Sequence, residues 1–216
     1  MKHELRVVDD LAGGALELFL EESPQTVLLT GGDTPLPFYE LLATLDYPWE
    51  DVEFFFSDER CVPDIDPRSN FRMANVALLS KVDAARYPMD GENCNADGYE
   101  EKLRERFGER PWFDFAVYGL GPDGHTASLF PGMPEVEETD RWVVEVRQAG
   151  WEPYVPRVSL TMSVLSAASV GVFLVSDETK REPLRRLLAG EDIPAARLTP
   201  KRLVVLADHG AAPPNS

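Results

Sequence analysis

The sequence predicts an α/β protein built on an open, mostly parallel twisted sheet with helices on both faces. Two observations carry this prediction. Apolar segments with strand character alternate with segments whose apolar residues recur at helical spacing, and the connections between them are short. The 216 residues suit a single domain, and the hydrophobic content of 44% is ordinary for a globular protein.

The first elements follow from spacing and from helix-start signals. Apolar side chains at helical intervals predict a helix over residues 9–22, and the apolar run 26–30 predicts a short buried strand. Pro35, which suits the first turn of a helix, opens a helix that carries Phe38 and Leu42.

A second strand and two further helices are expected in the middle of the chain. Residues 52–57 contain three consecutive phenylalanines and predict a strand, which leads into a loop over residues 58–63. Ser69 and Asn70 open a helix whose apolar face includes Val76, and residues 98–107 form another amphipathic helix.

The second half repeats the same alternation. Strands are expected over 113–118, 141–146, 157–161, 170–175 and 202–207, and helices over 164–168 and 178–188. We expect one domain over residues 1–209, followed by a loose tail over residues 210–216.

Charge and composition exclude several classes of function. The net charge of −17 disfavours nucleic acid and anionic membranes as partners, because both require a basic surface. The sequence has no apolar run near the ~20 residues that span a bilayer and no signal peptide, so we expect a cytoplasmic protein. No apolar stripe is left over for a partner subunit, which favours a monomer.

The two cysteines, Cys61 and Cys94, predict neither a disulfide framework nor a metal site. We expect reduced thiols, with Cys61 as a buried and unreactive side chain.

The most informative segment is 114–131, in which an apolar strand runs directly into a glycine-rich loop. The loop holds Asp123, Gly124 and His125, and His125 is one of only three histidines in the chain. Open α/β folds bind ligands at the carboxyl ends of their strands. This segment therefore predicts a catalytic base beside a carboxylate, although a capped turn is the alternative for an Asp-x-His sequence.

Two other loops also follow predicted strands. Gly31, Gly32 and Thr34 precede a helix, so their backbone N–H groups are candidates for binding phosphate, with a tight turn capped by Thr34 as the alternative. Asp58 and Arg60 end the second strand and are candidates for holding a polar substrate, with a solvated turn as the alternative.

Two cations lie at the starts of later elements. Arg157 begins a strand, and Lys180 lies in the first turn of a helix, where a cation is unfavourable unless an anion meets it. Together they suit a phosphate clamp, and surface charge is the alternative for each.

Taken together, these motifs resemble the 6-phosphogluconolactonase family, which is similar in fold to the glucosamine-6-phosphate deaminases and their modified Rossmann-like sheet. The resemblance covers segments 30–35, 57–63, 69–70, 119–131, 157–161 and 178–180, in the same order and spacing. Segment 119–131 (Gly-Leu-Gly-Pro-Asp-Gly-His-Thr-Ala-Ser-Leu-Phe-Pro) is the most specific. The resemblance implies hydrolysis of 6-phospho-D-glucono-1,5-lactone in the oxidative pentose phosphate pathway, without a metal or organic cofactor.

The resemblance also implies roles for the candidate residues. His125 is expected to take a proton from water, Asp123 to orient its imidazole, and Arg60 or the loop amides near Gly124 to stabilise the oxyanion. The resemblance implies that the phosphate is held by Gly31, Gly32, Thr34, Arg157 and Lys180. It implies that the sugar hydroxyls are contacted by Asp58 and Asn70.

One position departs from the family. Asp33 stands where the family usually has Ser, and a carboxylate facing a phosphate is repelled by about 1 kcal/mol in a wet site. We therefore expect the Asp33 side chain to turn away and cap the following helix.

Three other functions are weighed against lactone hydrolysis. A deaminase of the same fold carries a ring-opening Glu five residues after the histidine, where this chain has Phe130. A sugar-phosphate-binding regulatory module needs a DNA-binding segment, for which the chain has no spare length. A serine hydrolase would use Ser128, but the Gly-x-Ser-x-Gly nucleophile elbow is absent.

Overall fold

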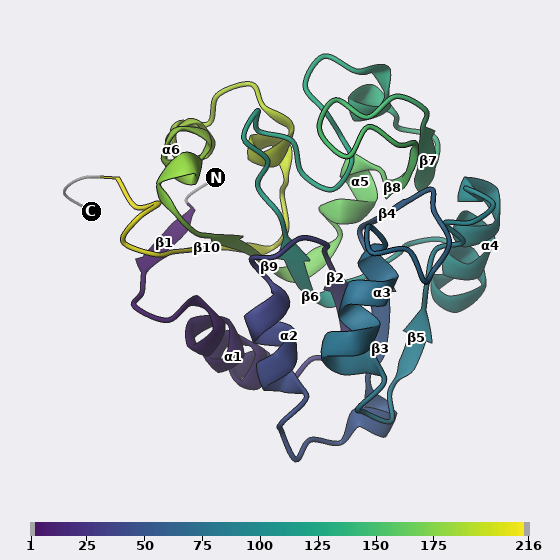
Figure 1. The fold of residues 1–216 in the computed structure, drawn as a ribbon, viewed down its shortest axis with the longest axis horizontal. Coiled ribbons are helices and arrows are strands. Elements are labelled where there is room, and N and C mark those ends of the chain that lie inside the picture. The colour runs from purple at the N-terminus through teal and green to yellow at the C-terminus, as the bar shows by residue number, and fades with distance from the viewer. Residues whose placement is uncertain (1–2, 214–216) are drawn as a thin grey trace.

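The computed structural model describes residues 3–213, which form two sheets with helices packed around them (Figure 1). The strands are β1 (Glu4–Val7), β2 (Thr26–Leu29), β3 (Glu53–Phe56), β4 (Asp58–Arg60), β5 (Ala85–Tyr87), β6 (Phe113–Tyr118), β7 (Val143–Val146), β8 (Arg157–Leu160), β9 (Ala168–Val175) and β10 (Arg202–Ala207). The α-helices are α1 (Leu11–Glu22), α2 (Leu36–Leu42), α3 (Asn70–Ala74), α4 (Ala96–Phe107), α5 (Met162–Leu165) and α6 (Arg181–Ala189).

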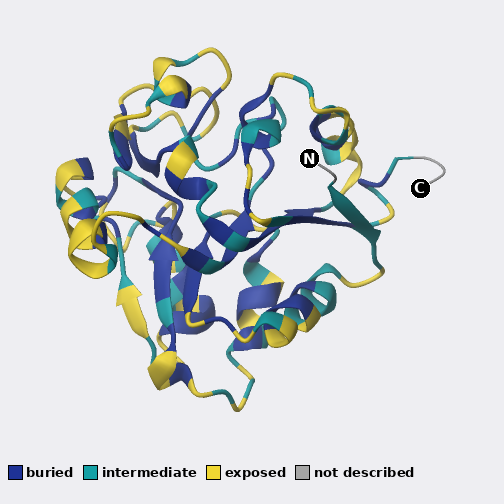
Figure 2. Cartoon of the chain, turned by 180° about the vertical axis from the view of Figure 1, so that it is seen from behind, coloured by how far each residue is buried: buried dark blue, intermediate teal, exposed yellow. Residues whose placement is uncertain are grey.

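The large sheet has seven strands in the order β1-β10-β9-β6-β2-β3-β5, and every neighbouring pair is parallel. Its five inner strands form the buried centre of the molecule, whereas the edge strands β1 and β5 are partly or largely exposed (Figure 2). The small sheet has the order β4-β8-β7 and is antiparallel. This architecture confirms the predicted open, mostly parallel α/β fold.

Helices cover both faces of the large sheet because successive side chains of a strand point to opposite sides. Phe56 of β3 meets Phe71 of α3, with ring centroids 5.8 Å apart, on the face where α2 contacts both α1 and α3. Phe55 points to the opposite face and meets Phe107 of α4 at 5.1 Å. The consecutive phenylalanines of β3 therefore join two separate layers of the core.

The order of the strands creates a crevice at one place in the large sheet. From β2 the chain adds β3 and β5 on one side, and from β6 it adds β9 and β10 on the other side. The direction of building reverses between β2 and β6, and open α/β sheets hold ligands at such a switch point, beyond the carboxyl ends of the strands. The loops that begin at Gly31 and Gly119 follow these two strands.

Several elements differ from the prediction. Residues 58–60 form a strand, β4, rather than part of a loop, and the predicted strands at residues 141–146 and 157–161 join it in the small sheet. The edge strands β1 and β5 were not predicted. Val76 was expected on the apolar face of its helix but is 59% exposed, because residues 75–79 form a π-helix whose wider turn shifts the positions of the side chains.

The expected loose tail is wrong for its first residues. Ala211 is fully buried and Ala212 nearly so. Asp208 holds this segment, because its Oδ1 accepts a hydrogen bond of 2.7 Å from the Ala211 amide. Residues 214–216 lie outside the described part of the chain.

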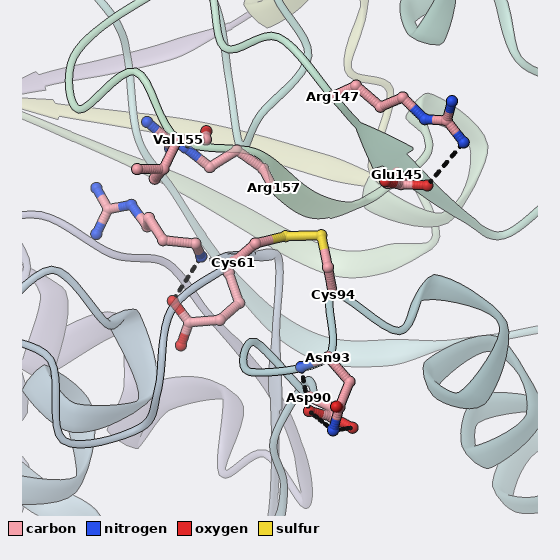
Figure 3. Close-up of a disulfide and its surroundings, with 10 residues drawn as sticks. Cys61, Asp90, Asn93, Cys94, Glu145, Arg147, Val155 and Arg157 are labelled. Atoms are coloured by element: carbon pink, nitrogen blue, oxygen red, sulfur yellow. Dashed lines mark hydrogen bonds and ion pairs between the residues drawn. A yellow bond between two sulfur atoms is a disulfide. The ribbon is translucent and has the colours of Figure 1, made fainter.

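The prediction of two reduced cysteines is also wrong, because Cys61 and Cys94 form a disulfide (Figure 3). Cys61 directly follows β4, and Cys94 lies in the loop that precedes α4. The amide of Cys61 donates to the carbonyl oxygen of Pro156 at 2.8 Å, which extends the pairing between β4 and β8. The disulfide therefore ties the small sheet to the segment that leads into α4. Within residues 3–213, no helix combines the length and the apolar composition needed to cross a membrane.

Candidate active site

A cavity of about 790 Å³ lies at the switch point of the large sheet. The loops after β2 and β6 line it, together with residues of β4, the start of α3 and the turn that contains Lys180. All predicted site residues except Asp123 and Gly124 line this cavity. The fold therefore brings together residues that lie up to 149 positions apart in the sequence, from Gly31 to Lys180.

His125 and Asp123 form a close pair at this cavity. The Nδ1 of His125 lies 2.5 Å from Oδ1 of Asp123, which also accepts the backbone N–H of His125 at 3.0 Å. Although burial acts to raise it, the pKa of Asp123 is lowered by the hydrogen bonds and the charge of His125. An ionised Asp123 places the proton on Nδ1, so Nε2 carries the lone pair that can accept a proton.

Glycine at position 121 allows the imidazole to lie against its own loop. A Cβ at Gly121 would lie 2.1 Å from Nδ1 of His125, so any side chain there would displace the ring. The amide of Gly121 donates to the His125 carbonyl oxygen at 2.8 Å, which closes the loop. Phe130 covers the imidazole, with ring centroids 4.7 Å apart.

Gly124 does not reach the cavity. Its amide donates to the carbonyl oxygen of Gly121 at 3.0 Å, so that N–H is not free to meet an oxyanion. A Cβ at this position would lie 2.7 Å from Ile193, and the φ angle of +93° is one that glycine adopts readily. Gly124 therefore shapes the loop instead of contacting a substrate.

The loop after β2 presents free amides to the cavity. Within the described chain, no hydrogen bond occupies the N–H groups of Gly31, Gly32, Asp33 or Thr34. Successive backbone N–H groups near a helix start are suited to binding an anion. Tyr39 fixes the entry to this loop, since its hydroxyl pairs with both the amide and the carbonyl oxygen of Thr30 at 2.9 Å.

The side chains of this loop do not cap α2. The N-cap position belongs to Pro35, and no side chain accepts a hydrogen bond there, so neither the predicted cap by Asp33 nor the alternative cap by Thr34 is formed. Thr34 instead pairs its hydroxyl with that of Ser176, with the oxygens 3.2 Å apart, which links this loop to the end of β9. Asp33 is exposed and lines the cavity.

Arg60 and Asn70 form a pair in the cavity wall. Nη1 of Arg60 donates to Oδ1 of Asn70 and to the carbonyl oxygen of Arg68. The Asn70 amide nitrogen donates to the backbone oxygen of Asp58 at 2.9 Å. A Cβ at Gly31 would lie 1.8 Å from Oδ1 of Asn70, so this glycine permits the close approach.

Asp58 is a buried residue of the cavity wall, and its carboxylate already accepts hydrogen bonds from the protein. It accepts hydrogen bonds from Ser57 at 3.0 Å and from Ser128 at 2.6 Å. Ser128 is itself fully buried and does not line the cavity, so its hydroxyl is not placed to attack a substrate. This burial removes the structural basis for a serine hydrolase.

Arg157 is buried, and each of its guanidinium nitrogens has a partner. Nε donates to Val155 at 3.2 Å, and Nη2 donates to the carbonyl oxygens of Trp151 at 3.4 Å and Pro153 at 2.8 Å. Nη1 lies 4.0 Å from the Asp58 carboxylate. Burial lowers the pKa of Arg157. The main contacts of this side chain therefore hold the 151–155 loop at the edge of the cavity.

Lys180 is a half-buried cation that also lines the cavity. It ends the 3₁₀ turn Glu178–Lys180, which precedes α6, and its Nζ donates to the carbonyl oxygen of Leu120 at 2.8 Å. Burial lowers the pKa of Lys180, against the opposing charges of Asp177 and Asp123.

Sequence reasoning missed a group of acidic residues that also line the cavity. They are Asp9, Asp10, Glu152, Asp177 and Asp208. They come from segments far apart in the chain, and only the acidic composition of the sequence hinted at them. Within residues 3–213, no cluster of three or more His, Cys, Asp or Glu side chains is arranged to hold a metal ion.

Comparison with known proteins places this chain in a family. Residues 4–207 match the family described as glucosamine-6-phosphate isomerases/6-phosphogluconolactonase. The chain is 39% identical to a 6-phosphogluconolactonase from Synechocystis sp., over 81% of this chain and 75% of that protein. It is 36% identical to a 6-phosphogluconolactonase from Thermotoga maritima, over 83% and 82% of the two chains.

The fold agrees with solved structures of the family. A crystal structure of 6-phosphogluconolactonase from Thermotoga maritima has a TM-score of 0.87 and 31% identity, and covers 96% of this chain and 99% of that one. A monomeric glucosamine-6-phosphate deaminase shares the fold at a TM-score of 0.80 with 20% identity. The chain therefore belongs to the glucosamine-6-phosphate isomerase/6-phosphogluconolactonase family.

Proposed function

We propose that this chain hydrolyses 6-phospho-D-glucono-1,5-lactone to 6-phosphogluconate, a step of the oxidative pentose phosphate pathway. The observation that carries the proposal is the His125–Asp123 pair, which lies at a cavity that is also lined by residues with free backbone amides. Relatives that match most of the chain are named 6-phosphogluconolactonase.

The proposed reaction begins with water held at Nε2 of His125. The imidazole takes a proton from this water as its oxygen attacks the lactone carbonyl carbon, and the carbonyl oxygen becomes an oxyanion. Asp123 holds the Nδ1 proton and stabilises the imidazolium that forms. Collapse of the tetrahedral intermediate breaks the bond to the ring oxygen, which receives the proton from Nε2 and leaves as a hydroxyl group.

Arg60 and Lys180 are the cations proposed to meet negative charge. Arg60 lies in the cavity wall beside Asn70 and is proposed to stabilise the oxyanion. Lys180 and the amides of residues 31–34 are proposed to bind the phosphate, as a cation and a set of N–H donors suit that group. Asn70 is proposed to contact the sugar hydroxyls.

Two other functions receive less support from the site. A deaminase needs a proton-transferring group five residues after the histidine, and this chain places the apolar ring of Phe130 there, buried against His125. A module that binds sugar phosphate without turnover would use the same cavity, and only activity distinguishes it from an enzyme.

The decisive experiment measures opening of 6-phosphogluconolactone, generated in situ, by wild type and by His125→Ala after subtraction of the uncatalysed rate. Removal of the proposed base is expected to lower kcat about 100-fold or more. His209→Ala is a matched control, since His209 is also paired with an aspartate, Asp9, at 3.0 Å but is largely exposed. We expect the control to retain wild-type activity.

Each result has one meaning. A wild-type rate equal to the background would reject lactone hydrolysis and favour the binding module. Equal rates for wild type and His125→Ala would keep the enzyme but remove His125 as the base.

A further inference from the structure

Glu59 is a buried carboxylate directly behind the cavity wall. Glu59 is 1% exposed and does not line the cavity. Oε1 accepts the backbone N–H groups of Arg60 and Asn70, both at 2.7 Å. Oε2 accepts the Phe71 amide at 2.7 Å and the Ser69 hydroxyl at 3.0 Å. All four partners are donors, and none of them is a cation. Burial raises the pKa of Glu59, and these four hydrogen bonds oppose that shift only in part.

These contacts explain where α3 begins. The first N–H groups of a helix have no partner within the helix. Glu59 accepts the N–H groups of Asn70 and Phe71, and the side chain of Ser69, the N-cap, accepts that of Arg72 at 3.0 Å. Glu59 therefore joins the first turn of α3 to β4.

The two residues held by Oε1 of Glu59 are both cavity residues. Arg60 and Asn70 line the cavity and bond to each other through Nη1 and Oδ1. Asn70 also packs against Gly31, the first residue of the loop with free amides. A shift of α3 relative to β4 would therefore move the guanidinium, the side-chain amide and their contact with this loop together.

We propose that Glu59 is a positioning residue for the reaction proposed above, acting through Arg60 and Asn70 without touching the substrate. This inference rests on the proposed function for its kinetic readout. A carboxylate suits the role because it presents only acceptors to four donors. Glutamine has nearly the same shape, but its NH₂ group would face N–H donors and leave at least one of them unpaired.

The test is a double-mutant cycle on kcat/KM with Glu59→Gln, Asn70→Ala and the variant that carries both changes. Glu59→Gln is expected to lower kcat/KM about 10-fold or more. If Glu59 acts through its neighbours, kcat/KM of the double variant should be no more than about threefold below that of the less active single variant. Unfolding temperatures of all variants show that each is folded at the assay temperature.

Asn95→Ala provides the matched control for loss of a helix cap. Asn95 caps α4 by accepting the Gly98 amide at 2.8 Å, and it does not line the cavity. This change should lower the unfolding temperature and leave kcat/KM at the wild-type value. A purely structural role for Glu59 would give the same pattern as this control.

Three results would overturn the proposal. The first is a kcat/KM of Glu59→Gln within twofold of wild type. The second is a loss of kcat/KM no larger than the unfolded fraction of Glu59→Gln explains. The third is that the two single losses of kcat/KM multiply in the double variant. If wild type itself opens no lactone, the proposed function fails, and a crystal structure of Glu59→Gln becomes the readout. Displacement of Asn70 from Gly31 would still support positioning, and an unchanged Asn70 would reject it.

Discussion

Reduction of the disulfide between Cys61 and Cys94 is expected to lower the free energy of unfolding by about 3.7 kcal/mol. The bond closes a loop with a sequence separation of 33 residues. In the chain-entropy relation, a loop of that length restricts the unfolded chain by about 12.5 cal/mol/K, which corresponds to about 3.7 kcal/mol at 25 °C. For a protein of 216 residues, this predicts a fall of about 7 to 15 °C in the melting temperature.

The assay is thermal unfolding followed by circular dichroism, with and without dithiothreitol. The double variant Cys61→Ser/Cys94→Ser is the control, because it should melt near the temperature of the reduced wild type and should not respond to the reductant. Titration of free thiols in the unreduced protein checks that the bond is present. Two free thiols, or melting temperatures that agree within 2 °C in the two conditions, would refute the reasoning.

Three further predictions concern the cavity. Gly31→Ala places a methyl group 1.8 Å from Oδ1 of Asn70 and should lower kcat/KM about 10-fold. Gly119→Ala is the control, because its methyl group would lie at an ordinary distance of 3.5 Å from the Thr30 hydroxyl, and its kcat/KM should stay within about twofold of wild type. Equal kcat/KM values for the two variants would contradict the proposed fit. Because burial lowers the pKa of Lys180, binding of 6-phosphogluconate should weaken at a pH below the ordinary lysine pKa of about 10.4. Calorimetry should find that the affinity of Lys180→Arg is lost only at a higher pH, since arginine stays charged. The same dependence of affinity on pH in both proteins would exclude Lys180 as the titrating group. The lowered pKa of Asp123 contributes stability above the unfolded pKa of about 3.9, and this contribution is lost as the pH falls through the folded pKa. Asp123→Asn should therefore lower the free energy of unfolding in urea at pH 6 and leave it unchanged near pH 2. An equal destabilisation at both pH values would argue against that linkage.

The centre of the fold could be predicted from sequence because its strands are determined by their own residues. Strands β6 and β10 match the predicted ranges 113–118 and 202–207 residue for residue, since both are apolar runs that end at turn residues. β4 could not be predicted in this way. It consists of three charged residues, and its partner strand β8 lies about a hundred positions later in the chain.

The same distinction holds within the site. His125, the amides after β2 and Lys180 follow directly from motifs at the ends of elements, and the structure brings them to one cavity. The arrangement of Gly124 depends on Ile193, and that of Arg157 depends on carbonyl oxygens of the loop before it, so neither pairing is visible in a local motif. Glu59 lies within segment 57–63 of the resemblance, but no local motif shows that its carboxylate accepts the amides at the start of α3.

The unequal number of charges around the cavity has a consequence for the end of the catalytic cycle. Seven acidic residues line it, namely Asp9, Asp10, Asp33, Asp58, Glu152, Asp177 and Asp208, whereas its basic side chains are Arg60, Arg157 and Lys180. Opening of a lactone creates a carboxylate, so the product carries one more negative charge than the substrate. Because like charges repel, the surrounding carboxylates should favour departure of the product over retention of the lactone. The inhibition constant of 6-phosphogluconate is therefore expected to exceed the KM of the lactone, which would let the enzyme work while its product accumulates.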